Sequence, residues 1–213
     1  MGTARTLGMQ RSRIRRWIAS VLIAGPAGFS TFETSAILGA VSLLSATAAP
    51  HLQQYLEMAH ATKALGDVKV IALSAFRLKF DVGHIGRHQR VRPTLLVSEG
   101  DVPESSDATT LPWTAPLDGG ATQSLAAHLV DNSAGYSVVP NDPFRWKGPY
   151  LEGLSADPWG SRYAMNVGFF QGNGGRTIFV VSPGPNRTVE TPFEMVGLRK
   201  GGDDVVGIIG RGQ

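Results

Sequence analysis

The sequence predicts an α+β protein in which a long N-terminal α-helix packs on a small C-terminal antiparallel β-meander. Two observations indicate this fold class. Up to about residue 80, a nearly uncharged apolar stretch passes into apolar residues at helical spacing. Nearer the C-terminus, short runs rich in β-branched and aromatic residues are separated by glycine-rich segments, a pattern typical of strands and turns.

The predicted helix covers residues 29–80, and residues 29–50 would form its membrane or filament half. After Pro50 the apolar residues recur at helical spacing, at Leu52, Leu56, Ala59, Leu65, Val68, Ala72 and Phe76. At 1.5 Å per residue the helix would be roughly 80 Å long, over twice the thickness of a membrane. Pro50 predicts a kink, because its ring removes a helical hydrogen bond. Residues 81–213 would form the head.

The head is expected to contain three main strands, at residues 162–170, 176–182 and 203–209. The glycine-rich residues 171–175 would join the first two in a tight turn, which indicates an antiparallel meander. A shorter strand and a short helix are expected at residues 91–97 and 124–130. One face of the sheet would pack on the second half of the long helix.

The charge of the chain is distributed unevenly. The 213 residues carry a formal charge of +3, but residues 1–28 contain five arginines and no acid, so the rest carries 3 − 5 = −2. The basic residues therefore belong to a leader, where they mark the cytoplasmic side of a membrane. This balance argues against a nucleic-acid partner. The chain has no cysteine, which excludes disulfides and thiolate metal sites.

Glu33 is the only charged side chain between Arg16 and Glu57, and it closely follows the pair Gly28-Phe29. A carboxylate in an apolar membrane segment is costly and usually has a partner. If the chain were cut after Gly28, the new amine of Phe29 would lie four residues from Glu33. The spacing therefore suggests that the Phe29 amine is the partner.

This N-terminus resembles the processing site of type IV prepilins and pseudopilins: a basic leader, Gly28, Phe29, Glu33 and an apolar helix with Pro50. The resemblance implies that residues 1–28 are removed by a prepilin peptidase and that Phe29 is N-methylated. It also implies polymerisation through the helix. Glu33 of one subunit would then meet the Phe29 amine of a neighbour, which sets the axial register.

Two further motifs are Gly148-Pro149-Tyr150-Leu151 and Asp157-Pro158-Trp159-Gly160-Ser161-Arg162-Tyr163. Asp-Pro starts a turn, and Gly160 permits a positive φ. Trp159 and Tyr163 would supply large anchors for a small core. The motifs are similar to the head of the major, G-type pseudopilins of type II secretion. We therefore expect a structural loop that shapes the head.

A third motif joins Ser182-Pro183-Gly184-Pro185-Asn186 to the later pair Asp203 and Asp204. Calcium takes six to eight oxygen ligands from carboxylates, amides and carbonyls. A similar loop in G-type pseudopilins binds calcium, so the resemblance implies a calcium site at Asn186, Asp203 and Asp204, with the carbonyls of Ser182 and Gly184. The alternative is a turn that satisfies its own hydrogen bonds.

The sequence also permits other interpretations. Residues 17–24 resemble the apolar region of a secretory signal, with Ala46-Thr47-Ala48 as its cleavage site. His84 and His88 have a metal-ligand spacing for a helix, but the nearby Gly83 and Gly86 argue against a helix there. The cluster Arg87, Arg90 and Arg92 is typical of a solvated face. No motif for an enzyme site is evident.

Together these patterns predict a non-enzymatic structural subunit of a type II secretion pseudopilus. Its expected partners are copies of itself, other pseudopilins, the prepilin peptidase and the inner-membrane secretion platform. The expected location is the bacterial inner membrane, crossed once, with the head in the periplasm. The alternatives are a type IV pilin or minor pilin-like subunit, and a signal-anchored extracytoplasmic binding module that does not polymerise.

Overall fold

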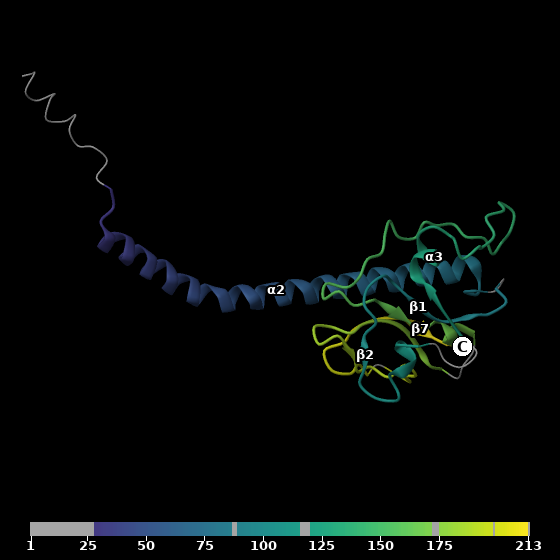
Figure 1. Ribbon diagram of the computed structural model, residues 1–213. Coiled ribbons are helices and arrows are strands. Elements are labelled where there is room, and N and C mark those ends of the chain that lie inside the picture. The colour runs from purple at the N-terminus through teal and green to yellow at the C-terminus, as the bar shows by residue number, and fades with distance from the viewer. Residues whose placement is uncertain (1–27, 87–88, 116–119, 172–174, 198, 213) are drawn as a thin grey trace, which may run out of the picture. The chain divides into compact units, whose positions relative to one another are not determined.

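The computed structural model describes residues 28–86, 89–115, 120–171, 175–197 and 199–212 (Figure 1). The predicted leader, apart from Gly28, lies outside the described residues. The chain divides into two compact units, residues 1–53 and 54–213. Helix α2 (Thr31–Val82) begins in the first unit and ends in the second. The predicted long helix is therefore confirmed, with both ends within two residues of those expected.

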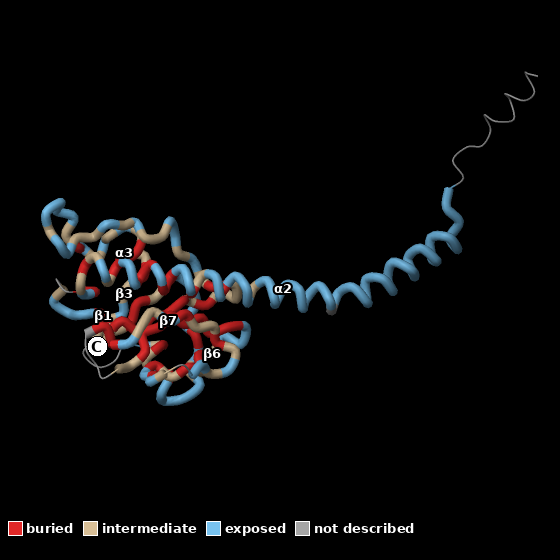
Figure 2. The backbone as a smooth tube through the Cα atoms, turned by 180° about the vertical axis from the view of Figure 1, so that it is seen from behind, coloured by how far each residue is buried: buried red, intermediate tan, exposed pale blue. Residues whose placement is uncertain are grey.

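In the first unit, every described residue of α2 whose side chain is described is exposed (Figure 2). This part of the helix is rich in serine and threonine, whose hydroxyls would be costly in an apolar surrounding. Several of them donate back to the carbonyl four residues earlier: Ser35 to Thr31 at 2.8 Å, and Ser42 to Leu38 at 2.7 Å. These local hydrogen bonds thus lower the free-energy cost of placing the hydroxyl groups in an apolar surrounding. By length and composition, α2 is long and apolar enough to cross a membrane once.

The second unit contains a five-stranded mixed sheet with the strand order β3-β1-β4-β5-β7. Its strands are β1 (Pro93–Val97), β3 (Ala121–Ser124), β4 (Ala164–Met165), β5 (Thr177–Ser182) and β7 (Val205–Arg211). β1 and β3 are parallel, and the other neighbours are antiparallel. The predicted pure antiparallel meander is therefore wrong, because the long connection after β1 returns to place β3 parallel at the sheet's end.

Smaller elements complete the head. β2 (Glu104–Ser105) and β6 (Thr188–Val189) form a separate parallel pair. Between the strands lie the 3-10 helix η1 (Leu111–Trp113) and the short helix α3 (Leu125–Leu129), which Ser124 caps by accepting a hydrogen bond from Ala126. The predicted strand near residues 91–97 and the predicted helix near 124–130 are confirmed. So are the strands near 176–182 and 203–209.

The strand predicted over residues 162–170 is mostly wrong. Only β4 is a strand, and the 3-10 helix η2 (Val167–Gln171) follows it. The physical reason is Asn166, which is fully buried and keeps one backbone bond to Phe179, at 3.4 Å, while its side chain makes its other bonds there. Its amide group accepts from the backbone of Phe179 at 2.8 Å and donates to the carbonyls of Thr177 and Phe193. A polar side chain thus ends the ladder and releases the next residues into a turn.

The core of the second unit lies between α2 and the sheet. α2 contributes Val68, Ile71, Ala75 and Leu78, which recur every three or four residues and are almost completely buried (Figure 2). The sheet contributes β5, all of whose residues are buried. On the other side of β5, Trp113 packs edge-on against Phe179 and Phe193 at centroid distances of 5.1 and 4.7 Å. Its indole donates to the carbonyl of Thr191, so the ring is buried with its polar atom satisfied.

Strand β7 approaches the backbone of α2 at Gly207. A Cβ atom at this position would lie 2.6 Å from the carbonyl oxygen of Val68, closer than side-chain carbons approach oxygen. We expect Gly207→Ala to destabilise the head by about 1–3 kcal/mol, as overpacked cores do. That corresponds to a fall of roughly 2–12 °C in Tm, measured by circular dichroism on residues 54–213. The matched control is Gly210→Ala in the same strand, where a Cβ atom would have no described atom within 4 Å apart from those of its two chain neighbours. Equal melting of the two variants would contradict the close approach.

Candidate functional site

The predicted processing site lies directly before helix α2. Gly28 and Phe29 are exposed and precede the first helical residue, Thr31. Ser30 caps the helix: its hydroxyl accepts from the backbone of Glu33 at 3.2 Å, and its own N–H donates to the Glu33 carboxylate at 2.9 Å. This reciprocal pair is a capping box. Glu33 therefore has a local role in starting the helix, in addition to the role that the sequence suggests in assembly.

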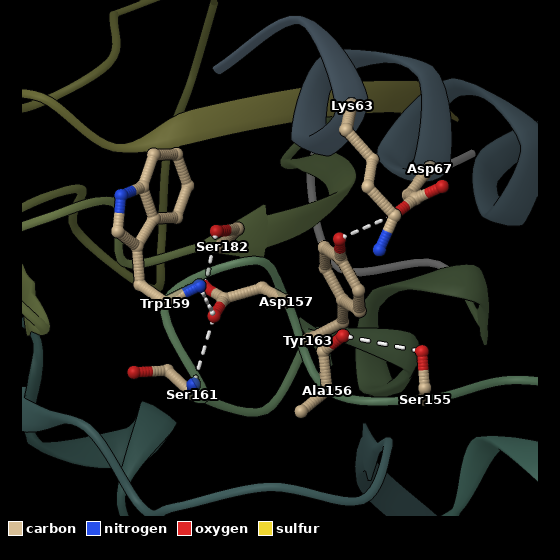
Figure 3. A network of polar contacts seen from close by, with 9 residues as sticks. All are labelled: Lys63, Asp67, Ser155, Ala156, Asp157, Trp159, Ser161, Tyr163 and Ser182. Atoms are coloured by element: carbon tan, nitrogen blue, oxygen red, sulfur yellow. Dashed lines mark hydrogen bonds and ion pairs between the residues drawn. The ribbon is translucent and has the colours of Figure 1, made fainter. Parts of the chain in front are cut away.

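Asp157 organises the loop formed by residues 157–163 (Figure 3). One carboxylate oxygen accepts from the backbone N–H groups of Trp159 at 3.0 Å and Ser161 at 2.8 Å. The other accepts from the hydroxyl of Ser182, on β5, at 2.6 Å. Gly160 has φ 92°, which an L-residue rarely adopts, and its N–H donates to the carbonyl of Asp157. The expected turn at this motif is therefore present, and Asp157 joins it to the sheet.

The same loop is attached to helix α2 through Tyr163. The tyrosine is almost fully buried, and its hydroxyl donates to the carboxylate of Asp67 at 2.8 Å (Figure 3). Burial, together with the adjacent Asp67 carboxylate, raises the pKa of Tyr163 well above its usual value, so the hydroxyl stays protonated. Trp159 packs edge-on against His60 of the helix, with centroids 6.1 Å apart. The two aromatic residues thus hold the loop against the helix.

The first motif, at residues 148–151, makes an equivalent attachment further along α2. The hydroxyl of Tyr150 donates to Asp81 at 2.9 Å, and the ammonium of Lys147 pairs with the same carboxylate at 2.7 Å. The pKa of Tyr150 is raised to about 12, mainly by burial and further by the hydrogen bond to the negatively charged Asp81. Ser74 also donates to the carbonyl of Tyr150 at 3.1 Å. Both predicted structural motifs therefore bind the head's loops to α2.

The predicted calcium ligands lie close together only in part. The backbone of Asn186 donates to Asp203 at 3.4 Å, and Gly184 lies against the backbone of Asp203. Asp204 instead accepts from the backbone of Glu190 and Thr191 at 3.0 and 2.6 Å. The hydroxyl of Ser182 points to Asp157, so only its carbonyl remains for a cation.

Two oxygens in this loop are chemically notable. Oδ1 of Asp203 and Oδ1 of Asp204 are buried, and neither has a hydrogen-bond partner within the described part of the chain. Burial raises the pKa of Asp204, because a charged carboxylate loses its solvation there. Buried acceptors without partners are groups that a hard cation can satisfy, which is the chemistry behind the predicted calcium site. Among the described residues, however, no three His, Cys, Asp or Glu side chains gather into a ready metal site.

The histidine spacing at His84 and His88 does not lie on a helix. Helix α2 ends at Val82, and His84 is exposed in the turn that follows, so the helical spacing that would pair it with His88 is absent. His88 and Arg87 lie outside the described residues. Arg90 and Arg92 are exposed, as expected for a solvated face.

Three residues of these sites were not identified from the sequence. Ser30 could have been found, because Ser-x-x-Glu before an apolar run is the signature of a capping box. Asp67 lies between the apolar positions Leu65 and Val68 of the predicted helix, and no local pattern marks its bond to Tyr163. Glu190 had no sequence signal, yet its carboxylate accepts from the backbone of Asp203 at 3.3 Å and from the side chain of Asn186 at 3.4 Å. It adds a third carboxylate to the Asp203 loop.

In comparisons with known proteins, no family model, no characterised protein and no solved structure matches this chain.

Proposed function

We propose that this chain is a pseudopilin, a structural subunit of the periplasmic filament that supports type II protein secretion. The observation that carries the proposal is the division of helix α2. Its first half, which follows Gly28 and Phe29, is apolar and exposed at each described side chain. Its second half is built into the core of a compact head. An apolar helix segment whose described side chains are all exposed needs lipid first and other subunits later.

In this proposal the chain is inserted in the bacterial inner membrane with its head in the periplasm. A prepilin peptidase cuts after Gly28 and methylates the amine of Phe29. The subunit then leaves the membrane through the secretion platform and joins copies of itself and other pseudopilins. Glu33 meets the Phe29 amine of a neighbour, which neutralises two charges in an apolar core and sets the register. A type IV pilin or minor pilin-like subunit is the closest alternative.

Mass analysis of the protein recovered from membranes tests the proposal. The expected N-terminus is a methylated Phe29, and Gly28→Leu should accumulate uncut precursor, because a bulky residue would not fit the peptidase site. A mature N-terminus at Ala49 would indicate an ordinary secreted protein and overturn the proposal. An uncut chain would instead favour a signal-anchored binding module that does not polymerise.

The proposal includes calcium in the head. Asp203, Asp204 and Asn186 would hold the ion, together with the carbonyls of Ser182 and Gly184, and the two unpartnered carboxylate oxygens support this assignment. Calcium would neutralise the carboxylates and join β7 to the loop after β5. It would thereby hold together two segments that are distant in the sequence.

Calcium should raise the Tm of the head. A ligand that binds only the folded state stabilises it by about 2.7 kcal/mol at a hundredfold excess over Kd. Because the pKa of Asp204 is raised in the fold, the calcium-free head should lose stability as the pH rises through that pKa. The calcium effect should therefore be larger above that pKa than below it. Asp203→Ala and Asp204→Ala should each remove it, and magnesium should replace calcium poorly. A melting curve that neither calcium nor chelator moves would show that the loop is a hydrogen-bonded turn.

A further inference from the structure

Helix α2 presents a line of exposed apolar side chains along its second half, which we call the apolar stripe. Its members are large and from 42% to 80% exposed: Tyr55, Met58, Leu65, Leu73, Phe76 and Phe80. With Thr62 and Lys69 between them, they follow one another in steps of three or four residues, which keeps them on one side of the helix. Val68, Ile71 and Ala75 on another side form the core. The stripe is thus not the surface that holds the head together.

A groove runs beside the stripe, where α2 meets the edge of the sheet. β7 is the last strand in the sheet order. The groove has a volume of about 360 Å³, and its lining is largely apolar, with Ala72, Leu73 and Phe76 from the helix and Ile208 and Ile209 from β7. Ile208 is 40% exposed. A stripe at helical spacing beside an apolar groove is the kind of surface that receives an apolar helix.

We propose that the apolar stripe and its groove receive the first half of α2, residues 31–53, from a second copy of this chain. This inference rests on the proposed polymerisation and names the surface that carries it. The occupant matches in length, since residues 31–53 span about 33 Å and the stripe about 38 Å. It also matches in chemistry, because it exposes Ile37, Leu38, Val41, Leu43 and Leu44.

Charge is compatible with this pairing. The sequence has no Asp, Glu, Lys or Arg between Glu33 and Glu57, so the occupant would bring no charge into the groove. The only charged side chain among the stripe positions is Lys69, which is exposed and whose long stem lets its ammonium reach water at the rim.

The contact must join two copies. Within one copy, residues 31–53 and the stripe are successive parts of the one helix α2, so they cannot lie side by side while that helix is intact. To lay residues 31–53 beside the stripe, the second copy must be shifted by roughly 24 residues, or about 36 Å along the helix axis. The stripe thereby predicts an axial stagger as well as a partner.

Cysteine cross-linking tests the inference, because the chain has no cysteine of its own. The full-length protein would carry Leu44→Cys together with a second cysteine at Leu65, Leu73, Phe76 or Phe80, and assembled filaments would be treated with a short bismaleimide. We expect covalent dimers and longer ladders from at least one of these pairs. The strongest pair reports the stagger. The control pair is Leu44→Cys with Val102→Cys, since Val102 is similarly exposed at 58% but lies outside the stripe and groove.

A second measurement separates the surface from folding. Phe76→Glu places a charge in the stripe at a position that is 52% exposed, so the Tm of the head should change little. Filament yield should fall at least tenfold, whereas Val102→Glu should leave it unchanged. Normal filaments from Phe76→Glu, or cross-linking of all four stripe pairs only at the control level, would overturn the inference while the proposed function stands. If the wild-type chain is not cut at Gly28 and forms no filaments, the proposed function itself fails, and the inference with it.

Discussion

Glu33→Ala is expected to abolish filament assembly while leaving the melting of the head, measured in the full-length protein, unchanged. In the proposed filament the Glu33 carboxylate neutralises the Phe29 amine of a neighbour, and its loss leaves a cation unpaired in an apolar core. Glu33 lies in the first unit, outside the compact head, so the head's stability should not depend on it. Electron microscopy of filaments and thermal melting of the head measure the two effects separately.

Glu33→Gln is the matched control, because the capping box gives Glu33 a second role. Glutamine can replace glutamate at this position of a capping box, so the bond from the N–H of Ser30 is kept while the charge is removed. If the charge pair governs assembly, Glu33→Gln should fail as completely as Glu33→Ala. If filaments return with Glu33→Gln, Glu33 acts by starting the helix, and the register hypothesis is wrong.

Asp157→Ala is expected to destabilise the head by about 3–5 kcal/mol, because it removes three hydrogen bonds at a buried position. The N–H of Ser161 and the hydroxyl of Ser182 are both fully buried, and neither can turn to water instead. The change should appear as a lower urea midpoint for residues 54–213 with an unchanged m-value.

Asp131→Ala provides the comparison for Asp157→Ala. Asp131 makes a similar turn, accepting from the backbone and hydroxyl of Ser133 at 2.9 and 2.8 Å, but it is exposed. Water can replace the hydrogen bonds of Asp131, so Asp131→Ala should destabilise the head much less than Asp157→Ala. Similar losses from the two variants would mean that burial of the Asp157 network contributes nothing to stability.

Several elements could be predicted because their causes are local. The helix could be predicted because apolar spacing and the run without charge act within a few turns. β5 and β7 could be predicted from their β-branched residues, and the loop at residues 157–163 from Asp-Pro and Gly160. The same local chemistry at Gly28, Phe29 and Glu33 is what suggests the proposed function.

Other features could not be predicted, because they depend on contacts between residues distant in the chain. Asn166 ends the expected strand because it reaches Phe179 and Phe193, and no local pattern marks that role. The parallel pairing of β1 with β3 follows a long connection whose path short-range periodicity does not encode. Likewise, Glu190 meets Asp203 only because β6 and β7 bring their loops together. Side-chain spacing sets which residues share a face of one element, but the packing of whole elements sets which faces meet.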